Sequence, residues 1–418
     1  MRVWLITVGE PLPIDDDNPR LLRTGILSDV LARRGDEVLW WTSAFDHVRK
    51  RHRCPTDAER EAGARCRIRL LHGRGYDRNV SVARYLDHRE VARKFRERQG
   101  SEPRPDVIVC SLPTVELCVE AVRYGERNRV PVAVDIRDLW PDLIAEIVPP
   151  WGRSTMKLLL SPLFRDVREV CSKATALFGL TPEFLDWGLG YAGREKSGLD
   201  RVFPMGYVAH APPREEVEEA SKRWEAAGVS AEDFNLCYFG AIGRQSDFGT
   251  VIDAARILSR GPRRFRFVLC GNGEKLDHYR KYAAGCPGIL FPGWVNRAEI
   301  YSLMRISSAG LVAFLNKKNY TWNLPNKPIE YLSAGLPVVS SLTGVLQRLL
   351  SGNRCGVTYE EGNPESLAEA LVRLYDDRNE LRRMAGNAKD LYDRSFQAER
   401  VYGEMAGHLQ RMTEEWRR

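Results

Sequence analysis

The sequence has no long hydrophobic run, since no stretch approaches the ~18 consecutive apolar residues that a membrane-spanning helix needs. The segment Met1–Val8 is a short strand-like run without the apolar region and small-residue cleavage site of a secretory signal. These absences argue against a transmembrane protein. We expect a cytoplasmic one, and peripheral contact with the inner leaflet of the cytoplasmic membrane stays open.

Metal-binding patterns are also missing. The nine cysteines are scattered with no C-x-x-C pair, and the seven histidines form no H-x-x-x-H or comparable cluster. We therefore expect buried thiols in a reducing compartment, no metal site and no cofactor.

What is present is enough material for two hydrophobic cores. The 418 residues are 43% hydrophobic and 28% charged, which is typical of a globular protein of two domains. Short runs that are apolar on both faces alternate with helical patterns, as in α/β domains built on doubly wound parallel sheets. The predicted strands are residues 3–8, 37–42, 106–112, 131–136, 175–180, 235–239, 265–270, 289–291, 310–314, 338–340 and 357–359.

The pattern weakens around residues 201–213, which predicts a domain boundary there. We expect an N-terminal Rossmann-like domain over residues 1–205, a second over 206–396, and a C-terminal helix, 397–418, that packs back on the first. Parallel α/β sheets bind ligands at the carboxyl ends of their strands, so the prediction is a central cleft with one ligand on each domain.

Two glycine turns follow predicted strands in the second half. Gly240 and Gly243 lie in one turn, and Gly271 and Gly273 lie in the other, where backbone N–H groups can approach a phosphate. The third glycine of the dinucleotide fingerprint is absent because position 276 is Leu, which argues against a nicotinamide or flavin site. Arg244 places a permanent positive charge beside the first turn.

The most informative stretch is residues 321–340. Pro325 and Asn326 can start a helix, Lys327 adds a charge in its first turn, and Glu330 follows three residues later. This arrangement suits a diphosphate and the ribose attached to it. The alternative is a capped helix with an internal salt bridge.

This stretch resembles the donor-binding segment of retaining glycosyltransferases of the GT-B fold, family 4. The most similar branch is that of bacterial N-acetyl-fucosaminyl and other cell-surface-glycan transferases. Residues 291–295 resemble the strand-end turn that reads the nucleotide base, and the two glycine turns match the family's phosphate loops in the expected order. The resemblance implies a donor-binding set of Gly240, Gly243, Gly271, Gly273, Trp294, Val295, Asn323, Leu324, Pro325, Asn326 and Glu330.

The resemblance also implies roles in catalysis. Lys327 and Arg244 would stabilise the leaving diphosphate without a metal, and Glu330 would bind the ribose. In the first half, residues 135–142 resemble the RDLWP segment of the same branch. Many relatives carry a His near the donor sugar in this region, and here Arg137 or Asp138 would orient the donor sugar or the acceptor. For Asp138 the alternative is a helix cap.

Two departures from the family pattern affect these assignments. The paired-glutamate motif keeps only Glu330, because its first position is Trp322. The first-loop Arg and Lys of many members are replaced by Ala241 and by Ser246 or Asp247. Neutralisation of the diphosphate would then fall on Lys327, Arg244 and helix amides, or on a first-domain arginine such as Arg20 or Arg23.

The acidic run 15–17 invites comparison with the D-x-D metal motif of the other major glycosyltransferase fold. Its place in a loop after the first strand is wrong for that motif, so we expect a solvated loop.

The net charge of +7 is concentrated in one segment. Residues 41–100 hold 16 Lys/Arg and 8 Asp/Glu, with Tyr76, Tyr85 and Phe95 among their aromatic residues. Such a surface suits an anionic acceptor or an anionic membrane leaflet, and the alternative is an ordinary solvated face. No motif supports nucleic-acid binding.

Taken together, the sequence predicts a retaining, hexosyl-type glycosyltransferase that uses a nucleotide-diphosphate sugar such as a UDP-sugar. The acceptor would be a lipid-linked or anionic glycan precursor, or a small-molecule aglycone. Two alternatives stay open. One is a nucleotide-sugar epimerase of the same fold, against which the missing first glutamate counts. The other is a non-catalytic nucleotide-sugar-binding subunit, which the replaced residues keep open.

Overall fold

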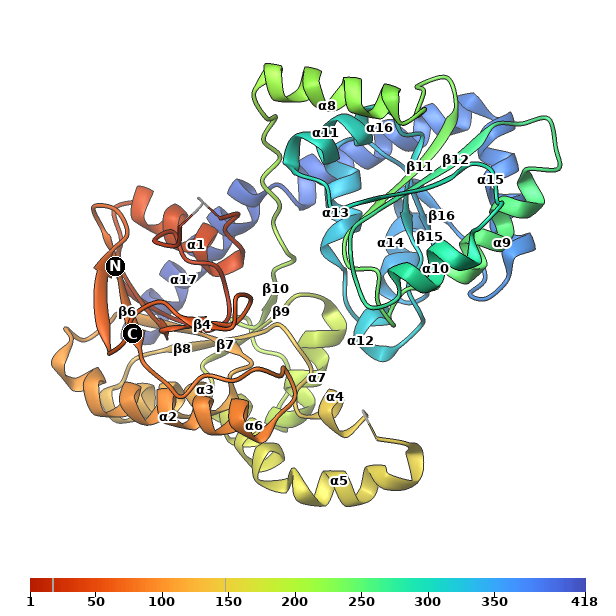
Figure 1. Ribbon diagram of the computed structural model, residues 1–418. Helices are drawn as coiled ribbons and strands as arrows, with labels where there is room; N and C mark the ends of the chain where they lie inside the picture. Colours follow the sequence, from red (N-terminus) through yellow and green to blue (C-terminus); the bar gives the residue numbers. More distant parts are fainter. Residues whose placement is uncertain (17–18, 147) are drawn as a thin grey trace. The chain divides into compact units, whose positions relative to one another are not determined.

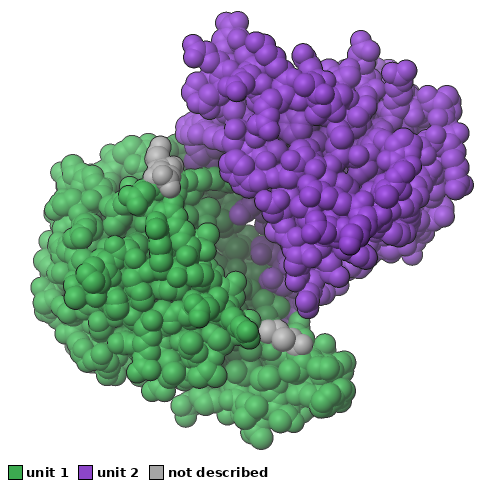
Figure 2. Space-filling view, viewed as in Figure 1, with its two compact units in different colours: residues 1–206, 398–418 green, residues 207–397 purple. Residues whose placement is uncertain are grey.

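The structure is a computed structural model that describes residues 1–418 except 17–18 and 147 (Figure 1). Asp17 of the predicted acidic loop therefore lies outside the described residues. The chain divides into two compact units (Figure 2). The first comprises residues 1–206 and 398–418, and the second comprises residues 207–397.

The first unit contains an eight-stranded sheet in the order β10-β9-β8-β7-β1-β2-β6-β5. All neighbouring strands are parallel except β5 and β6, which form an antiparallel edge. A small antiparallel pair, β3 and β4, lies outside this sheet. The strands are β1 (Arg2–Ile6), β2 (Glu37–Ser43), β3 (Phe45–Asp46), β4 (Arg51–His52), β5 (Ala58–Glu61), β6 (Cys66–Leu71), β7 (Val107–Leu112), β8 (Val132–Ile136), β9 (Ala176–Gly179) and β10 (Arg201–Val202).

Helices cover both faces of this sheet (Figure 1). They are α1 (Arg23–Arg33), α2 (Val82–Arg98), η1 (Gln99–Ser101), α3 (Val115–Asn128), α4 (Asp142–Ala145), η2 (Pro150–Gly152), α5 (Arg153–Leu159), α6 (Ser161–Lys173), α7 (Pro182–Ala192) and α17 (Ala398–Arg417). The last helix packs on α1, where the Arg33 guanidinium lies 2.8 Å from a carboxylate oxygen of Glu399. Helix α17 thus belongs to the core of the first unit, although the whole second unit separates it in sequence from the rest of the first.

The second unit contains a six-stranded parallel sheet in the order β13-β12-β11-β14-β15-β16. Its strands are β11 (Phe234–Phe239), β12 (Phe265–Cys270), β13 (Ile289–Gly293), β14 (Ala309–Val312), β15 (Val338–Ser340) and β16 (Gly356–Thr358). Its helices are α8 (Arg214–Ala226), α9 (Phe248–Leu258), α10 (Leu276–Tyr282), α11 (Arg297–Ile306), α12 (Lys318–Thr321), α13 (Asn326–Ser333), α14 (Val345–Asn353), α15 (Pro364–Asp376) and α16 (Arg378–Ser395).

Each sheet reverses its strand order once, and the reversal fixes where a ligand can bind. In the first unit the order runs outward from β1 through β2 in one direction and from β7 through β8 in the other. In the second unit the reversal lies between β11 and β14. Loops that leave the carboxyl ends of two such strands diverge to opposite faces and leave an opening between them.

The predicted fold class is confirmed, because both units are built on parallel α/β sheets. Every strand predicted from the sequence is present within a few residues of its predicted bounds. The sequence reading missed β5 and β6 in the basic segment. Strand β6 buries Cys66, Ile68 and Leu70 on one face and turns Arg67 and Arg69 to the other, a period of two that the high arginine content obscured.

No helix among the described residues is long and apolar enough to cross a membrane.

Candidate functional site

In the second unit, Gly240 and Lys327 meet at the strand-order reversal. Gly240 follows β11 with φ at +146°, and a Cβ built on it would lie 2.6 Å from the Lys327 Nζ. Lys327 lies in the first turn of α13, whose N-cap is Pro325. The missing side chain of Gly240 thus leaves the space that the lysine side chain occupies. This close contact explains why a glycine is needed at the end of β11.

The Lys327 ammonium lies between two aromatic rings. Its Nζ is 5.1 Å from the ring centroid of Tyr238 and 5.2 Å from that of Phe314, which come from the ends of β11 and β14. Burial lowers its pKa, and Glu330 one turn later opposes this effect. Among the ion pairs of the described residues, none involves Lys327. A buried cation with aromatic neighbours is stabilised by an anionic ligand.

The second glycine turn serves the packing of one loop on another. A Cβ on Gly271 would lie 1.8 Å from the carbonyl oxygen of Gly240, and one on Gly273 would lie 2.3 Å from that of Ile242. The backbones are joined there, because Ile242 N–H donates to the Asn272 carbonyl at 2.9 Å. Gly271 and Gly273 therefore hold the two loops together. In the first turn, by contrast, the atoms nearest a Cβ on Gly240 or Gly243 are the ends of the flexible Lys327 and Gln245 side chains.

The positions that depart from the family pattern have structural roles here. The Asp247 carboxylate caps α9, accepting from the backbone N–H and the hydroxyl of Thr250. Trp322 lies in the segment between α12 and α13, with the Lys318 Nζ 4.1 Å from its ring centroid. The Arg244 side chain is 79% exposed, and its Nε lies 3.0 Å from a carboxylate oxygen of Glu274. Arg244 is thus an exposed surface cation, unlike the half-buried Lys327.

The remaining predicted donor residues lie at the same carboxyl edge of the sheet. Trp294 is exposed directly after β13, and Val295 behind it is buried. Asn323 accepts a hydrogen bond from the backbone N–H of buried Leu324 at 2.8 Å. Asn326 is exposed at the first turn of α13, and Glu330 is buried in the second.

In the first unit, Arg137 belongs to a buried ion-pair network. Its Nε donates to Asp135 at 2.7 Å, and its Nη1 pairs with Glu10. Arg23 binds both carboxylate oxygens of Asp135, at 2.8 and 2.9 Å, and also donates to the Pro204 carbonyl. Burial opposes ionisation of Asp135, but the two guanidiniums outweigh it and lower its pKa. Arg23 is therefore committed to this network, which argues against its use as a diphosphate ligand.

Asp138 interacts electrostatically with Arg84, which lines a pocket at the other strand-order reversal. It accepts from the Leu139 N–H at 3.0 Å, and burial raises its pKa despite a favourable interaction with Arg84. The Arg84 guanidinium lies 4.6 Å from the Trp140 ring centroid and 5.5 Å from that of Tyr76. The structure thus brings the predicted residue Asp138 close to a cation of the basic segment.

The pocket has a volume of about 180 Å³. It is lined by residues that follow β1 and β7 and by residues of the basic segment, namely Val8, Gly9, His47, Tyr76, Arg84, His88, Pro113 and Thr114. His47 Nδ1 and the Tyr76 hydroxyl are 2.6 Å apart, and Lys50 Nζ lies 4.6 Å from the Tyr76 ring centroid. The hydroxyl of Thr114 is buried and has no hydrogen-bond partner in the part of the chain that the structure describes. The lining combines one cation, Arg84, with hydroxyls and imidazoles, a set able to bind a polar or anionic group.

Burial shifts the pKa values of titratable groups in and behind this pocket in the direction that favours their neutral forms. Burial, together with Lys50 and Arg84, lowers the pKa of His47 to about 4. Burial and Arg84 likewise lower that of His88 to about 3. Behind His88, burial raises the pKa of Glu116 to about 7. His47 and His88 are therefore neutral at physiological pH, and a neutral imidazole has one ring nitrogen able to accept a hydrogen bond.

Sequence reasoning did not single out His47, Arg84, His88 or Thr114. The available signal was their place after predicted strands or in the basic segment, beside the aromatic Tyr76. Reading the histidines only for metal-ligand spacing overlooked them.

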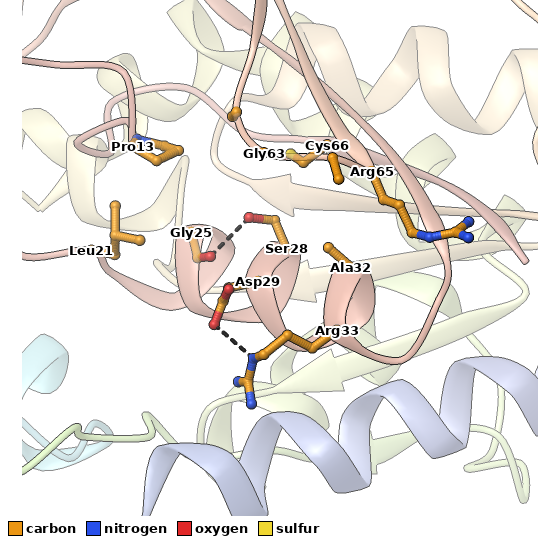
Figure 3. A pocket seen from close by; sticks show the side chains of 12 residues that line it. Pro13, Leu21, Gly25, Ser28, Asp29, Ala32, Arg33, Gly63, Arg65 and Cys66 are labelled. Atoms are coloured by element: carbon orange, nitrogen blue, oxygen red, sulfur yellow. Dashed lines mark hydrogen bonds and ion pairs between the residues drawn. The ribbon is translucent and has the colours of Figure 1, made fainter.

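A larger groove of about 360 Å³ lies between α1 and the β5–β6 turn (Figure 3). Small side chains line much of it, including Gly25, Ser28 and Ala32. The Arg33 guanidinium is held by Asp29 within the groove and by Glu399 of α17. The groove therefore lacks the converging polar groups of the smaller pocket. No group of three or more metal-ligating side chains is found among the described residues.

Comparisons with known proteins bear on this geometry. Residues 233–377 match the family model described as "Glycosyl transferases group 1". Sucrose-phosphate synthase from Thermosynechococcus elongatus is similar in structure, with a TM-score of 0.70 and 16% identity over 99% of each chain. The fold is GT-B. HepE of Anabaena, solved with UDP, has a TM-score of 0.65 and 16% identity over 98% of this chain and 100% of its own.

A protein from Listeria monocytogenes described as a candidate UDP-N-acetylglucosamine 2-epimerase shares the GT-B fold. Its TM-score is 0.61, with 13% identity over 99% of this chain and 97% of its own. At such identities the likeness shows the fold alone. Together with the group 1 match in the second unit, the GT-B fold supports a glycosyltransferase. Comparison with curated protein sequences finds no match.

Proposed function

We propose that this protein is a retaining glycosyltransferase of the family 4 type. It transfers a hexosyl-type sugar from a nucleotide-diphosphate sugar. UDP is the first nucleotide to test, because HepE was solved with UDP. The observation that carries the proposal is the half-buried Lys327 at the start of α13, beside Gly240, for which no ion pair is found among the described residues.

The diphosphate of the donor accumulates negative charge as the sugar leaves. A fixed ammonium and the free N–H groups of Asn326 and Lys327 at the helix start can stabilise that charge without reorganising. Arg244 is exposed and held by one surface ion pair, so it can turn toward the diphosphate at low cost. Glu330, one turn into the helix, would accept hydrogen bonds from the ribose hydroxyls. The charges of the diphosphate are met by protein groups, so we expect activity to persist in EDTA.

For the acceptor we propose the pocket of the first unit. Arg84 and Lys50 would hold an anionic group of the acceptor, such as a phosphate or carboxylate, and Asp138 would orient its reacting hydroxyl. An acceptor of this kind could be a lipid-linked or anionic glycan precursor, and the former would bring the enzyme to the membrane surface.

An Arg84→Gln variant tests the acceptor site. We expect KM for the acceptor to rise at least tenfold while KM for the donor stays constant. The control is Arg93→Gln on the same helix, where Arg93 is exposed and pairs with Glu97. Equal effects of the two variants would place the acceptor elsewhere.

The donor site is tested by thermal shift with UDP, GDP, CDP and dTDP. A nucleotide at 100 times its dissociation constant stabilises the native state by about 2.7 kcal/mol. If none of the four raises Tm, the proposal fails. If one does, the matched sugar nucleotides are supplied with and without lipid extract, and the anomeric configuration of the product is read by NMR. Epimer release without acceptor would indicate the epimerase, and binding without turnover would indicate a non-catalytic subunit.

A further inference from the structure

The segment formed by η2 and α5 exposes large apolar side chains to solvent. Trp151 is 86% exposed, Leu158 74% and Leu159 70%. Helix α5 buries none of its residues. Figure 1 shows α5 at the margin of the first unit, beyond α6 and away from the sheet. Three large apolar side chains within nine residues exceed the scattered exposure that is normal at a protein surface.

The charged residues within this segment have one sign, whereas the exposed Glu146 precedes it and Asp166 follows it. Residues 148–165 contain Arg153, Lys157 and Arg165 and no Asp or Glu. Arg153, Lys157 and Arg165 are all exposed. An apolar surface with basic side chains and no carboxylates complements an anionic lipid leaflet, where the apolar groups enter the acyl boundary and the cations meet the headgroups.

The basic segment 41–100 is a weaker candidate for contact with an anionic membrane than its net charge indicates. Eight of its sixteen basic side chains lie in ion pairs with carboxylates, namely Arg53, Arg67, Arg69, Arg74, Arg93, Lys94, Arg96 and Arg98. Arg67 and Arg69, for example, share Glu59 and Glu102. Arg84 lines the pocket, and Lys50 lies over the ring of Tyr76, which also lines it. Much of the +8 therefore serves to hold this part of the unit together.

We propose that residues 148–165 form a membrane-docking segment in which Trp151, Leu158 and Leu159 insert into an anionic lipid surface. The segment would place the first unit at the leaflet that holds a lipid-linked acceptor. In that respect the inference rests on the proposed function, but the lipid contact itself requires neither donor nor transfer. A second copy of the chain is a less suitable occupant, because two such basic surfaces would repel each other.

Vesicle flotation tests the proposal on the full chain, using phosphatidylcholine alone or mixed with phosphatidylglycerol. We expect binding to the mixed vesicles that weakens at high salt. The triple variant Trp151→Ser/Leu158→Ser/Leu159→Ser should lose at least tenfold in partitioning. Its matched control is Val48→Ser/Val82→Ser, which removes side chains 72% and 74% exposed in the basic segment. This control should bind as the wild type does.

A second measurement locates the insertion. Brominated lipids should quench part of the tryptophan fluorescence, and Trp151→Phe should remove that part while binding persists. Unchanged flotation of the triple variant would overturn the proposal, as would loss of binding only in the Val48→Ser/Val82→Ser control. A change of sedimentation coefficient in the triple variant, without a change in flotation, would indicate self-association through this patch and would also overturn it.

The nucleotide thermal shift separates the two proposals. The triple variant should keep the wild-type nucleotide response, since its substitutions lie on the first unit and the donor site on the second. If the protein floats with vesicles but no nucleotide raises its Tm, the docking segment is supported and the proposed function is contradicted.

Discussion

Lys327 shows how partial burial of one charged residue bears on the proposed donor site. The ammonium is enclosed by aromatic rings and the Gly240 backbone, and burial lowers its pKa. A charge in such a place is stabilised when an anion arrives, which is the electrostatic condition that a leaving diphosphate needs.

We expect Lys327→Ala to lower kcat by about 10²–10³-fold, because it removes charge that matters most in the transition state. Glu330→Ala should mainly raise KM for the donor. The control is Lys389→Ala, where an exposed lysine pairs with Asp393 on α16. Steady-state kinetics measure kcat and the donor KM of each variant. Equally small effects of Lys327→Ala and Glu330→Ala would show that the donor site lies elsewhere.

The same residue predicts a pH dependence. A bound diphosphate raises the pKa of Lys327, whereas the free protein holds it below the usual 10.5. Nucleotide affinity should therefore decrease as pH rises through the lowered pKa, because the free lysine loses its proton. Calorimetric titration should detect proton uptake on binding in that range. Lys327→Ala should abolish this uptake.

His88 and Glu116 predict stability effects of opposite sign. His88 has a pKa near 3 in the fold against 6.5 when exposed, so its contribution is complete above about pH 6.5 and is lost toward lower pH. Glu116 has a pKa near 7 against 4.5, so its buried carboxyl costs stability as pH rises from 4.5 through 7. Urea unfolding at pH 5 and pH 8 should show that His88→Gln is more harmful at pH 8. Glu116→Gln should be more beneficial there.

At the scale of the element, glycines determine how the two loops of the second unit join. Gly271 and Gly273 resemble a phosphate-binding turn in sequence, yet their missing side chains make room for the backbone after β11. A glycine pattern therefore does not reveal whether a ligand or another loop approaches the backbone.

Replacement of Gly271 should disturb this junction. Gly271→Ala places a Cβ 1.8 Å from a carbonyl oxygen at φ +131°, so we expect a loss of more than about 2 kcal/mol in unfolding free energy. Gly386→Ala in α16 meets nothing within 4 Å and should stabilise by up to about 1 kcal/mol. Denaturant unfolding compares the two. Similar stability of both variants would contradict the packing role of Gly271.

The basic segment gives a second lesson at this scale. Its arginines predicted a charged surface, and the antiparallel β5–β6 edge instead pairs several of them with carboxylates. Charge counts are additive along a sequence, whereas ion pairing depends on which strands become neighbours.

At the scale of the whole molecule, the two units differ in how their chains are assembled. The second is continuous over residues 207–397, and the first is completed by α17. In α17, the buried residues Tyr402, Met405 and Leu409 contribute to the core of the first unit.

We expect a fragment of residues 207–397 to fold and to keep nucleotide binding. A fragment of residues 1–206 should aggregate, because it exposes the apolar surface that α17 covers. Circular dichroism and thermal shift of the two fragments test this, and co-expression of residues 398–418 with the shorter fragment should restore solubility. A well-folded fragment 1–206 would contradict the structural role of α17.

The sequence by itself determined the parallel α/β architecture and predicted where the donor segment lies. Runs of buried strand residues and a helix start with Lys327 are local features, because hydrophobic periodicity and helix capping act over a few residues. Only the tertiary structure decided which of the marked residues meet. It paired Arg137 and Arg23 with Asp135, exposed Arg244, gathered His47, Tyr76 and Arg84 around one pocket, and left Trp151, Leu158 and Leu159 in solvent. Burial and pairing depend on strand order and helix packing, which join residues that are remote in sequence.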